Sequence, residues 1–368
     1  MQQHNPYRIL ISGGGTGGHI FPAIAIANAL KTRDPRTEFL FVGAEGRMEM
    51  QKVPEAGYTI EGLNITGFQR GNLLKNLGLP FKIASSLVKA NSIINTFKPD
   101  VVVGVGGFAS GPVMWVGAKK GIPVLVQEQN QFAGMTNKLV ANSAQKFCVA
   151  YEGMERFFPK DKIVVTGNPV RAEILNRNVT REEALSHFKL DANKKTILII
   201  GGSLGSRCIN NAIKKDIALL QNSGHQVLWQ TGKMYFEEMK AAAEGYADVH
   251  ALEFIKRMDL AYEVANVIIS RAGAISISEL CLVGKPVILL PSPNVTEDHQ
   301  TYNAQALVDK SAALMIKDAV ADRELIPAVL ALLNDNSQQI LLGKNIKSLA
   351  INNAAERIAD EVIKLIEK

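Results

Sequence analysis

The chain has 368 residues, of which 47% are hydrophobic and 21% charged, which indicates a globular protein with more than one buried core. Its net charge of +6 favours an anionic partner, such as a phosphate group, a membrane surface or a nucleic acid, without choosing among them. Three widely spaced cysteines exclude a disulfide framework and a thiolate metal site, and the N-terminus lacks the pattern of a signal peptide, so we expect a cytoplasmic protein.

Short apolar stretches alternate with helical patterns along the whole chain. Near-continuous apolar strands separated by helices are typical of parallel sheets that are covered on both faces, so the predicted fold class is α/β. The predicted strands lie in YRILISG (7–13), EFLFVG (38–43), VVVGVGG (101–107), PVLVQEQN (123–130), KIVVTGN (162–168), KTILIIGG (195–202), QVLWQTG (226–232), NVIISRAG (266–273) and PVILLPSP (286–293).

Residues 9–30 and 197–220 share one order of elements: a strand, a glycine turn and an amphipathic helix. This internal similarity predicts two Rossmann-like domains that face each other across a cleft, where open α/β sheets bind ligands. We expect an N-terminal domain of residues 1–169, a C-terminal domain of residues 170–349, and a last helix in 350–368 that packs back toward the N-terminal domain.

The first glycine turn contains Gly13, Gly15 and Gly18 in the pattern G-x-G-x-x-G. Such a turn lets backbone N–H groups approach a phosphate at a helix N-terminus, although a merely tight turn has the same sequence. Pro22 is expected in the first turn of the following helix. His19 is either a general base or a polar residue that completes the hydrogen bonds of the turn.

A dinucleotide site would also need an acidic residue at the end of the second strand, to bind the ribose. We expect that strand to end at Val42 and Gly43, which leaves Glu45 too far along the chain. The sequence therefore argues against NAD or FAD.

Two more glycine turns follow predicted strands, one with Gly104, Gly106 and Gly107, and one in GGSLG at 201–205. The latter also matches G-x-S-x-G, the nucleophile turn of α/β-hydrolases. A hydrolase would use Ser203 as nucleophile, with Asp259 and His299 available as its partners. The duplicated halves and the lack of an HGGG-type loop argue against this alternative.

Ser276 and Glu279 form S-x-x-E after another strand. Glu279 is therefore either a helix-capping residue or a carboxylate that accepts both hydroxyls of a ribose, while Ala274 and Ile275 meet a base. Arg171 could neutralise a diphosphate or pair with a carboxylate. Gln300 could bind sugar hydroxyls or lie on a solvated helix.

Residues 101–118 carry no charge, but their glycines and Pro112 indicate a strand, a turn and a helix start instead of a membrane span. Between Glu61 and Asp100 the chain has no acidic residue, and cations surround apolar residues there. This pattern favours contact with anionic lipid at 68–81, followed by a helix whose Ile83, Leu87, Ala90 and Ile94 face the core. The predicted membrane patch consists of Leu73, Leu74, Leu77, Leu79, Phe81, Arg70, Lys75 and Lys82.

The histidines form no H-x-x-x-H pair, and the chain has no D-x-D and no G-K-[ST] after a glycine turn. We therefore expect no metal site and no kinase or ATPase chemistry.

Taken together, these motifs resemble those of the bacterial peptidoglycan N-acetylglucosaminyltransferase family. The resemblance implies a GT-B fold, an N-terminal acceptor- and membrane-binding domain and a C-terminal donor domain. It also implies inverting transfer of N-acetylglucosamine from UDP-N-acetylglucosamine to the C4 hydroxyl of undecaprenyl-diphospho-N-acetylmuramoyl-pentapeptide (lipid I). The motifs that carry it are GGGTGGHIFPAIAIA, GVGGFASGP, EQNQFAGMTNK, TGNPVR, GGSLGSR, EFI, SRAGAISISEL and EDHQ.

The resemblance also implies roles for individual residues. His19 would be the base, with Glu128 as its electrostatic partner. Many family members have a second glutamine where this chain has Thr301, so contacts of that position are not carried over. The implied UDP-N-acetylglucosamine ligands are Thr16, Gly17, Gly18, Asn130, Arg171, Ser203, Ile255, Ala274, Ile275, Ser276, Ile277, Ser278, Glu279 and Gln300.

The expected mechanism is a single displacement in which two helix N-termini and Arg171 stabilise the departing UDP, so no cofactor or metal is required. The expected partners are UDP-N-acetylglucosamine, lipid I and an anionic membrane surface, with proteins of cell-wall synthesis and cell division as candidates, and no nucleic acid. The resemblance implies a peripheral location at the cytoplasmic face of the inner membrane.

Overall fold

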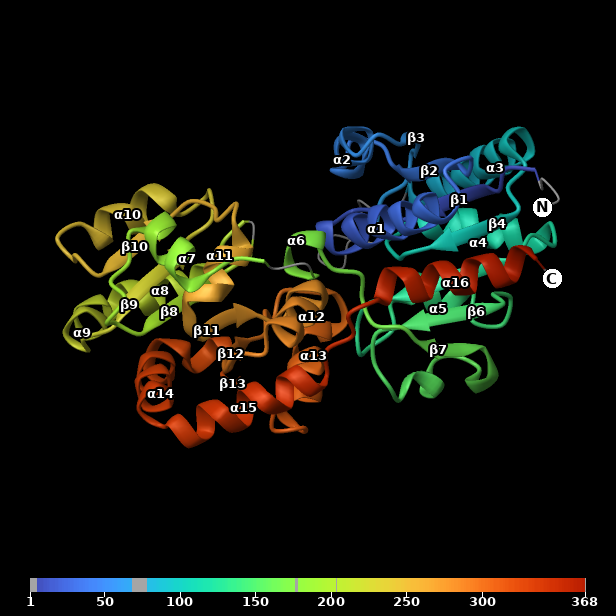
Figure 1. The fold of residues 1–368 in the computed structure, drawn as a ribbon. Coiled ribbons are helices and arrows are strands. Elements are labelled where there is room, and N and C mark those ends of the chain that lie inside the picture. The colour runs from blue at the N-terminus through green and yellow to red at the C-terminus, as the bar shows by residue number, and fades with distance from the viewer. Residues whose placement is uncertain (1–4, 68–77, 176–177, 203, 368) are drawn as a thin grey trace. The chain divides into compact units, whose positions relative to one another are not determined.

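The computed structural model describes residues 5–67, 78–175, 178–202 and 204–367. The chain divides into two compact units: unit 1 comprises Met1–Val170 with Asn353–Lys368, and unit 2 comprises Arg171–Asn352. Each unit is built around a parallel sheet with helices on its faces, which confirms the predicted α/β class (Figure 1).

Unit 1 contains a seven-stranded sheet of order β3-β2-β1-β4-β5-β6-β7. Its strands are β1 (Arg8–Ser12), β2 (Glu38–Ala44), β3 (Thr59–Leu63), β4 (Val101–Gly104), β5 (Val124–Glu128), β6 (Lys146–Val149) and β7 (Ile163–Val165). Its helices are α1 (Gly17–Arg33), α2 (Glu49–Glu55), α3 (Leu79–Phe97), α4 (Ser110–Lys119), α5 (Met135–Leu139) and α16 (Ala354–Ile366), with short 3-10 turns at Met154–Arg156 and Lys160–Lys162.

Successive side chains of β1 enter separate cores on the two faces of this sheet. Leu10 packs in the core with residues of α3 and α4, whereas Ile9 and Ile11 pack in the core with residues of α1 and α16. Alternation along the strand thus explains why β1 is apolar throughout. The last helix belongs to unit 1, where α16 lies along α1 and Asp360 pairs with Arg33 (Figure 1).

Unit 2 contains a six-stranded sheet of order β10-β9-β8-β11-β12-β13. Its strands are β8 (Thr196–Ile200), β9 (Gln226–Gln230), β10 (Val249–Leu252), β11 (Ala265–Arg271), β12 (Val287–Leu290) and β13 (Leu314–Met315). Its helices are α6 (Ala172–Leu175), α7 (Arg181–Phe188), α8 (Arg207–Lys215), α9 (Ile217–Asn222), α10 (Phe236–Ala243), α11 (Met258–Val264), α12 (Ala274–Val283), α13 (His299–Val308), α14 (Ala321–Asn334) and α15 (Asn336–Ser348), with 3-10 turns at Thr296–Asp298 and Asp318–Val320.

Two sequence predictions of local structure are wrong. Helix α1 begins at Gly17, because His19 N–H and Ile20 N–H both donate to Thr16 O, so Pro22 lies in the second helical turn and not in the first. Strand β2 continues to Ala44, where its pairing with β3 ends, so Glu45 directly follows the strand. The position of Glu45 therefore no longer argues against a dinucleotide.

Strands β3, β6, β10 and β13 were not predicted. Three of them, β3, β10 and β13, lie at sheet edges, where a strand has a partner on one side only and needs a weaker apolar pattern. Residues 101–104 form β4, and 110–119 form α4, as the glycines of this stretch indicate. Within the described ranges, no helix combines the length and the apolar composition that a membrane crossing requires.

Candidate functional site

The first two glycine turns lie side by side in unit 1, because they follow the paired strands β1 and β4. A Cβ on Gly107 would lie 2.4 Å from Gly14 O, and Gly107 has a φ of +83°. A Cβ on Gly13 would lie 2.1 Å from Cγ2 of Val105. Gly107 therefore packs backbone against backbone with the first turn at the carboxyl ends of the strands, and Gly13 packs against the Val105 side chain, close contacts that only glycine permits.

The first turn already holds a carboxylate of the protein itself. Glu49, the first residue of α2, is 1% exposed. Its Oε2 accepts a hydrogen bond from Gly15 N–H (2.9 Å), and its Oε1 accepts one from Ala44 N–H (3.0 Å). A phosphate at the N–H of Gly15 would have to displace this anion, which argues against phosphate binding at that point of the turn. The sequence analysis missed Glu49, and its only signal is its place five residues after the end of β2.

His19 lies in the first turn of α1, beside both glycine turns. Its Nδ1 is 3.0 Å from Gly14 O and 3.3 Å from Thr16 Oγ1. Because a carbonyl oxygen only accepts, the bond to Gly14 requires a proton on Nδ1 and leaves the Nε2 lone pair as the basic position of the neutral ring. Nε2 is 3.0 Å from the place that a Cβ on Gly106 would occupy, so the second turn makes room for the imidazole. Thr16 and Gly18 are exposed at this helix end, and Gly17 is partly exposed.

Glu128 organises the loop that follows β5. Its carboxylate is 1% exposed and accepts hydrogen bonds from Asn130 N–H (3.0 Å), Asn130 Nδ2 (3.3 Å), Gly134 N–H (2.9 Å) and Asn137 Nδ2 (2.9 Å). Burial raises the pKa of Glu128, and these hydrogen bonds oppose that effect. Both carboxylate oxygens of Glu128 thus bind the segment that follows β5, and they hold Asn130 in place. The predicted role of Glu128 as the electrostatic partner of His19 stays a prediction.

The third glycine turn, after β8 in unit 2, packs against the turn after β9. A Cβ on Gly205 would lie 2.1 Å from Thr231 O, and Gly205 has a φ of +81°. Ser206 then caps α8 by accepting a hydrogen bond from Ile209 N–H (3.3 Å). Ser203 lies outside the described residues. The acid proposed for the hydrolase alternative, Asp259, accepts hydrogen bonds from Arg257 (2.7 and 3.0 Å), and this pairing lowers the pKa of its carboxyl.

Glu279 is a buried ion-pair partner and not a helix cap. Helix α12 begins at Ala274 after the N-cap Gly273, which puts Glu279 well inside the helix, so the capping-box interpretation is wrong. Glu279 is 4% exposed and accepts hydrogen bonds from Arg171 Nε (2.8 Å), Arg171 Nη2 (2.9 Å) and Tyr262 OH (3.1 Å). Burial opposes the charge of Arg171, but the bonds to Glu279 raise the pKa of the guanidinium. Tyr262 was not singled out from the sequence.

This arrangement limits how Glu279 can bind a ribose. A carboxylate offers about four acceptor positions, and three bonds to Arg171 and Tyr262 are already made. Both hydroxyls of a ribose can therefore be accepted only if Arg171 or Tyr262 gives up at least one of these bonds.

The remaining predicted ligands of unit 2 differ in exposure. Ala274, Ile275, Ser276 and Ser278 are partly exposed along the start of α12. In contrast, the side chains of Ile255 and Ile277 are buried, and their N–H groups donate to Gln230 Oε1 (2.9 Å) and Gly273 O (2.9 Å). Gln300 Oε1 accepts from Ser292 N–H (2.9 Å), and the Thr301 hydroxyl donates to Asp298 Oδ1 (2.7 Å).

The predicted membrane patch is described only in part. Leu79, Phe81 and Lys82 form the start of α3, where Phe81 is 80% exposed. Ala90 and Ile94 of this helix are buried as predicted, but Ile83 is 42% exposed, so its predicted place in the core is wrong. Arg70, Leu73, Leu74, Lys75 and Leu77 lie outside the described residues.

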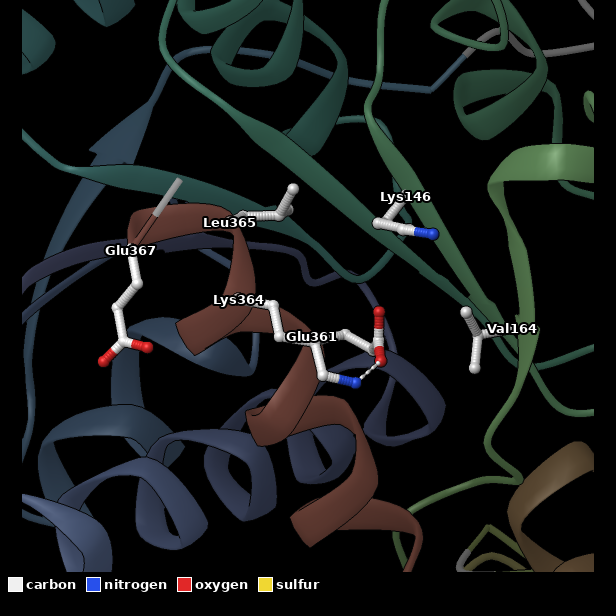
Figure 2. A pocket seen from close by; sticks show the side chains of 6 residues that line it. All are labelled: Lys146, Val164, Glu361, Lys364, Leu365 and Glu367. Carbon is white, nitrogen blue, oxygen red and sulfur yellow. Dashed lines mark hydrogen bonds and ion pairs between the residues drawn. The ribbon is translucent and has the colours of Figure 1, made fainter.

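A hollow of about 510 Å³ lies beneath α16, away from the predicted site residues of unit 1 (Figure 2). Lys146, the first residue of β6, lines it, so this hollow lies at the opposite end of the sheet from the glycine turns. Across the ranges that the structure describes, no three or more His, Cys, Asp and Glu side chains gather as metal ligands would.

Comparisons with known proteins match both units. The family model described as "Glycosyltransferase family 28 N-terminal domain" matches residues 9–149, and the "Glycosyltransferase family 28 C-terminal domain" matches residues 196–362. A protein of Flavobacterium psychrophilum named "UDP-N-acetylglucosamine--N-acetylmuramyl-(pentapeptide) pyrophosphoryl-undecaprenol N-acetylglucosamine transferase" is 56% identical, with 98% of each chain covered. A protein of the same name from Parabacteroides distasonis is 55% identical, covering 98% of this chain and 99% of the relative.

Solved structures agree with these matches. The crystal structure of MurG from Acinetobacter baumannii is 28% identical, with a TM-score of 0.80 over 98% of this chain and all of that one. The calicheamicin glycosyltransferase CalG4 is 12% identical with a TM-score of 0.73, so it shares the fold.

Replacing Gly107 with alanine tests the close packing of the two turns in unit 1. Gly121→Ala is the matched control, because Gly121 has a similar φ of +75° but open space around its Cβ. We expect the control to cost roughly 1–2 kcal/mol through backbone strain alone. Gly107→Ala should cost about 1–3 kcal/mol more, because its Cβ would overlap Gly14 O.

The two variants are compared by urea denaturation, followed by the fluorescence of Trp115 with Trp229 replaced by Phe, since these are the two tryptophans. Equal losses of unfolding free energy would contradict the packing argument.

Proposed function

The chain belongs to glycosyltransferase family 28, and we propose that it transfers N-acetylglucosamine from UDP-N-acetylglucosamine to the C4 hydroxyl of undecaprenyl-diphospho-N-acetylmuramoyl-pentapeptide. The observation that carries this proposal is the 56% identity, over 98% of both chains, to a relative whose name states the donor, the acceptor and the transferred sugar. The C4 hydroxyl is the position that the sequence resemblance implies. Both domains of the family are matched in this chain, at 9–149 and 196–362.

In the proposed reaction, unit 2 binds the donor. The N-terminus of α8 and the guanidinium of Arg171 stabilise the negative charge that develops on the departing diphosphate. Ala274, Ile275 and Ser276 contact the uracil ring of UDP, Glu279 accepts hydrogen bonds from the ribose hydroxyls, and Gln300 binds the N-acetylglucosamine. The diphosphate competes with Glu279 for Arg171, so donor binding itself frees the acceptor positions that the ribose needs.

Unit 1 supplies the base. His19 Nε2 takes the proton of the acceptor C4 hydroxyl, whose oxygen attacks the anomeric carbon of the donor. The bond from that carbon to the diphosphate breaks, UDP leaves with the electron pair, and the anomeric configuration inverts. The exposed N-terminus of α1, at Thr16 and Gly18, adds a favourable dipole, so the mechanism includes no cofactor or metal.

We assign the membrane contact to the exposed face of α3 that carries Phe81 and Val88. Phe81 and Val88 are 80% and 71% exposed, and their spacing of two helical turns places them on one face. Trp115 of the neighbouring α4 is 47% exposed, with the ammonium of Lys119 5.7 Å from its ring centroid. Apolar residues flanked by cations suit a peripheral contact with anionic lipid at the cytoplasmic face.

The function is tested by incubating the protein with labelled UDP-N-acetylglucosamine and a short-chain lipid I analogue. Transfer predicts a labelled lipid product and free UDP. Labelling of Ser203 by a fluorophosphonate with no transfer would instead support the hydrolase alternative, and binding of the donor with no transfer would indicate a sugar-nucleotide sensor.

His19→Ala should lower kcat by about 100-fold or more, because loss of a general base costs this much. The affinity for UDP, measured by calorimetry, should persist, because the proposed donor site lies in unit 2. The exposed His187 provides the control, and His187→Ala should keep wild-type turnover. Near-wild-type kcat in His19→Ala would remove His19 from the role of base.

Glu279→Ala should weaken UDP binding and also lower the melting temperature, because Arg171 and Tyr262 both lose their partner. Asp259→Ala is the matched control, since it removes a carboxylate paired with Arg257 on α11, outside the proposed site. The control should leave UDP affinity unchanged when measured by calorimetry. A lower melting temperature with unchanged UDP affinity in Glu279→Ala would show that Glu279 is structural only.

Replacing both Phe81 and Val88 with serine should weaken binding to anionic liposomes at least about tenfold, because each buried apolar side chain contributes roughly 1.5–3 kcal/mol. Sedimentation with liposomes measures this. Ile340→Ser is the control, because Ile340 is 72% exposed but lies on α15 of unit 2. Equal sedimentation of the double variant and the wild type would contradict the assignment.

A further inference from the structure

Glu49 is a buried carboxylate that the reaction described above does not use. It makes no ion pair with the residues that the structure describes, and its hydrogen bonds come from the backbone N–H groups of Gly15 and Ala44. Burying a charge without a counter-ion is costly, so such a group is retained only where its hydrogen bonds are well formed.

The fold makes room for this side chain at two glycines. A Cβ on Gly14 would lie 2.1 Å from Glu49 Oε1, and a Cβ on Gly43 would lie 2.4 Å from Glu49 Cγ. Any larger residue at either position would displace the carboxylate from the turn. The space for the Glu49 side chain is therefore provided by Gly14, which follows β1, and by Gly43, near the end of β2.

One peptide group connects Glu49 to His19. The N–H of Gly15 donates to Glu49 Oε2 (2.9 Å), and the C=O of the same peptide, that of Gly14, accepts from His19 Nδ1 (3.0 Å). A trans peptide is planar, and its N–H and C=O point in opposite directions, so the carboxylate and the imidazole lie on opposite sides of it. A hydrogen bond to a carboxylate polarises the peptide and makes its carbonyl oxygen a better acceptor.

We propose that Glu49 is a positioning residue for His19, acting through the Gly14–Gly15 peptide group. The carboxylate holds this peptide in the orientation that keeps a proton on His19 Nδ1 and makes Nε2 the basic nitrogen of the neutral ring. In Ser-His-Asp triads a carboxylate contacts histidine directly and fixes its tautomer; here a peptide group lies between them. Glu49 itself takes no proton. The inference rests on the proposed function, because it needs His19 as the base.

The test compares Glu49→Gln, His19→Ala and the double variant in the transferase assay. Glu49→Gln should lower kcat about tenfold while KM for UDP-N-acetylglucosamine changes less than about twofold, since the amide keeps one acceptor oxygen but loses the charge. In the His19→Ala background the same change should cost less than about twofold, because two groups that act as a unit are not additive. Glu45→Gln is the control, an exposed carboxylate paired with Lys89, and should leave kcat unchanged.

An equal loss of kcat in both backgrounds, or no loss in Glu49→Gln, would overturn the proposal while leaving His19 as the base. Wild-type turnover in His19→Ala would instead refute the base assignment, and this proposal with it. If Glu49→Gln does not fold, ¹⁵N spectra of histidine-labelled wild-type protein still test the proposal, because they report which ring nitrogen of His19 carries the proton. A neutral His19 protonated on Nδ1 supports the proposal, and one protonated on Nε2 overturns it.

Discussion

The packing of backbone against backbone at the carboxyl ends of the strands is the constraint on which the rest of the structure depends. In unit 1 a Cβ at Gly107 would meet Gly14 O, and in unit 2 a Cβ at Gly205 would meet Thr231 O. Each unit thus brings the turns after two neighbouring strands into backbone contact, those after β1 and β4 in unit 1 and those after β8 and β9 in unit 2. Helices α1 and α8 begin after these turns, at Gly17 and Arg207, where their N-terminal N–H groups are presented.

Three buried carboxylates, on α2, β5 and α12, each accept hydrogen bonds from a different kind of partner. Glu49 binds backbone N–H groups, Glu128 binds the amides of its own loop, and Glu279 binds Arg171 and Tyr262. Of the three, Glu279 alone has a cationic partner among the residues that the structure describes, the guanidinium of Arg171. Glu49 and Glu128 thus hold backbone segments in place, whereas Glu279 holds Arg171, the residue that the proposed mechanism assigns to the diphosphate.

The sequence predicted the α/β class and the glycine turns because both are encoded by local patterns, such as the apolar run of β1 and the glycines after β4. It failed where a distant residue decides the outcome. Ser276 and Glu279 have the spacing of a capping box, but Arg171 and Tyr262 bind the Glu279 carboxylate from other elements. Pro22 was placed in the first helical turn because the pattern does not show that Gly17 and Gly18 are already helical.

The α/β class, the glycine turns and the resemblance to the family were determined by the sequence alone, because residue type and spacing along the chain are sufficient for these. Only the tertiary structure decided which charges meet. Glu49 reaches the turn of His19 because β1 and β2 are neighbours in the sheet. The paired residues of these strands are 30 positions apart in the chain, so no local sequence pattern shows this contact. The glycine turn that resembles a phosphate cradle in sequence is thereby a turn that already contains an anion, placed behind the histidine proposed as the base.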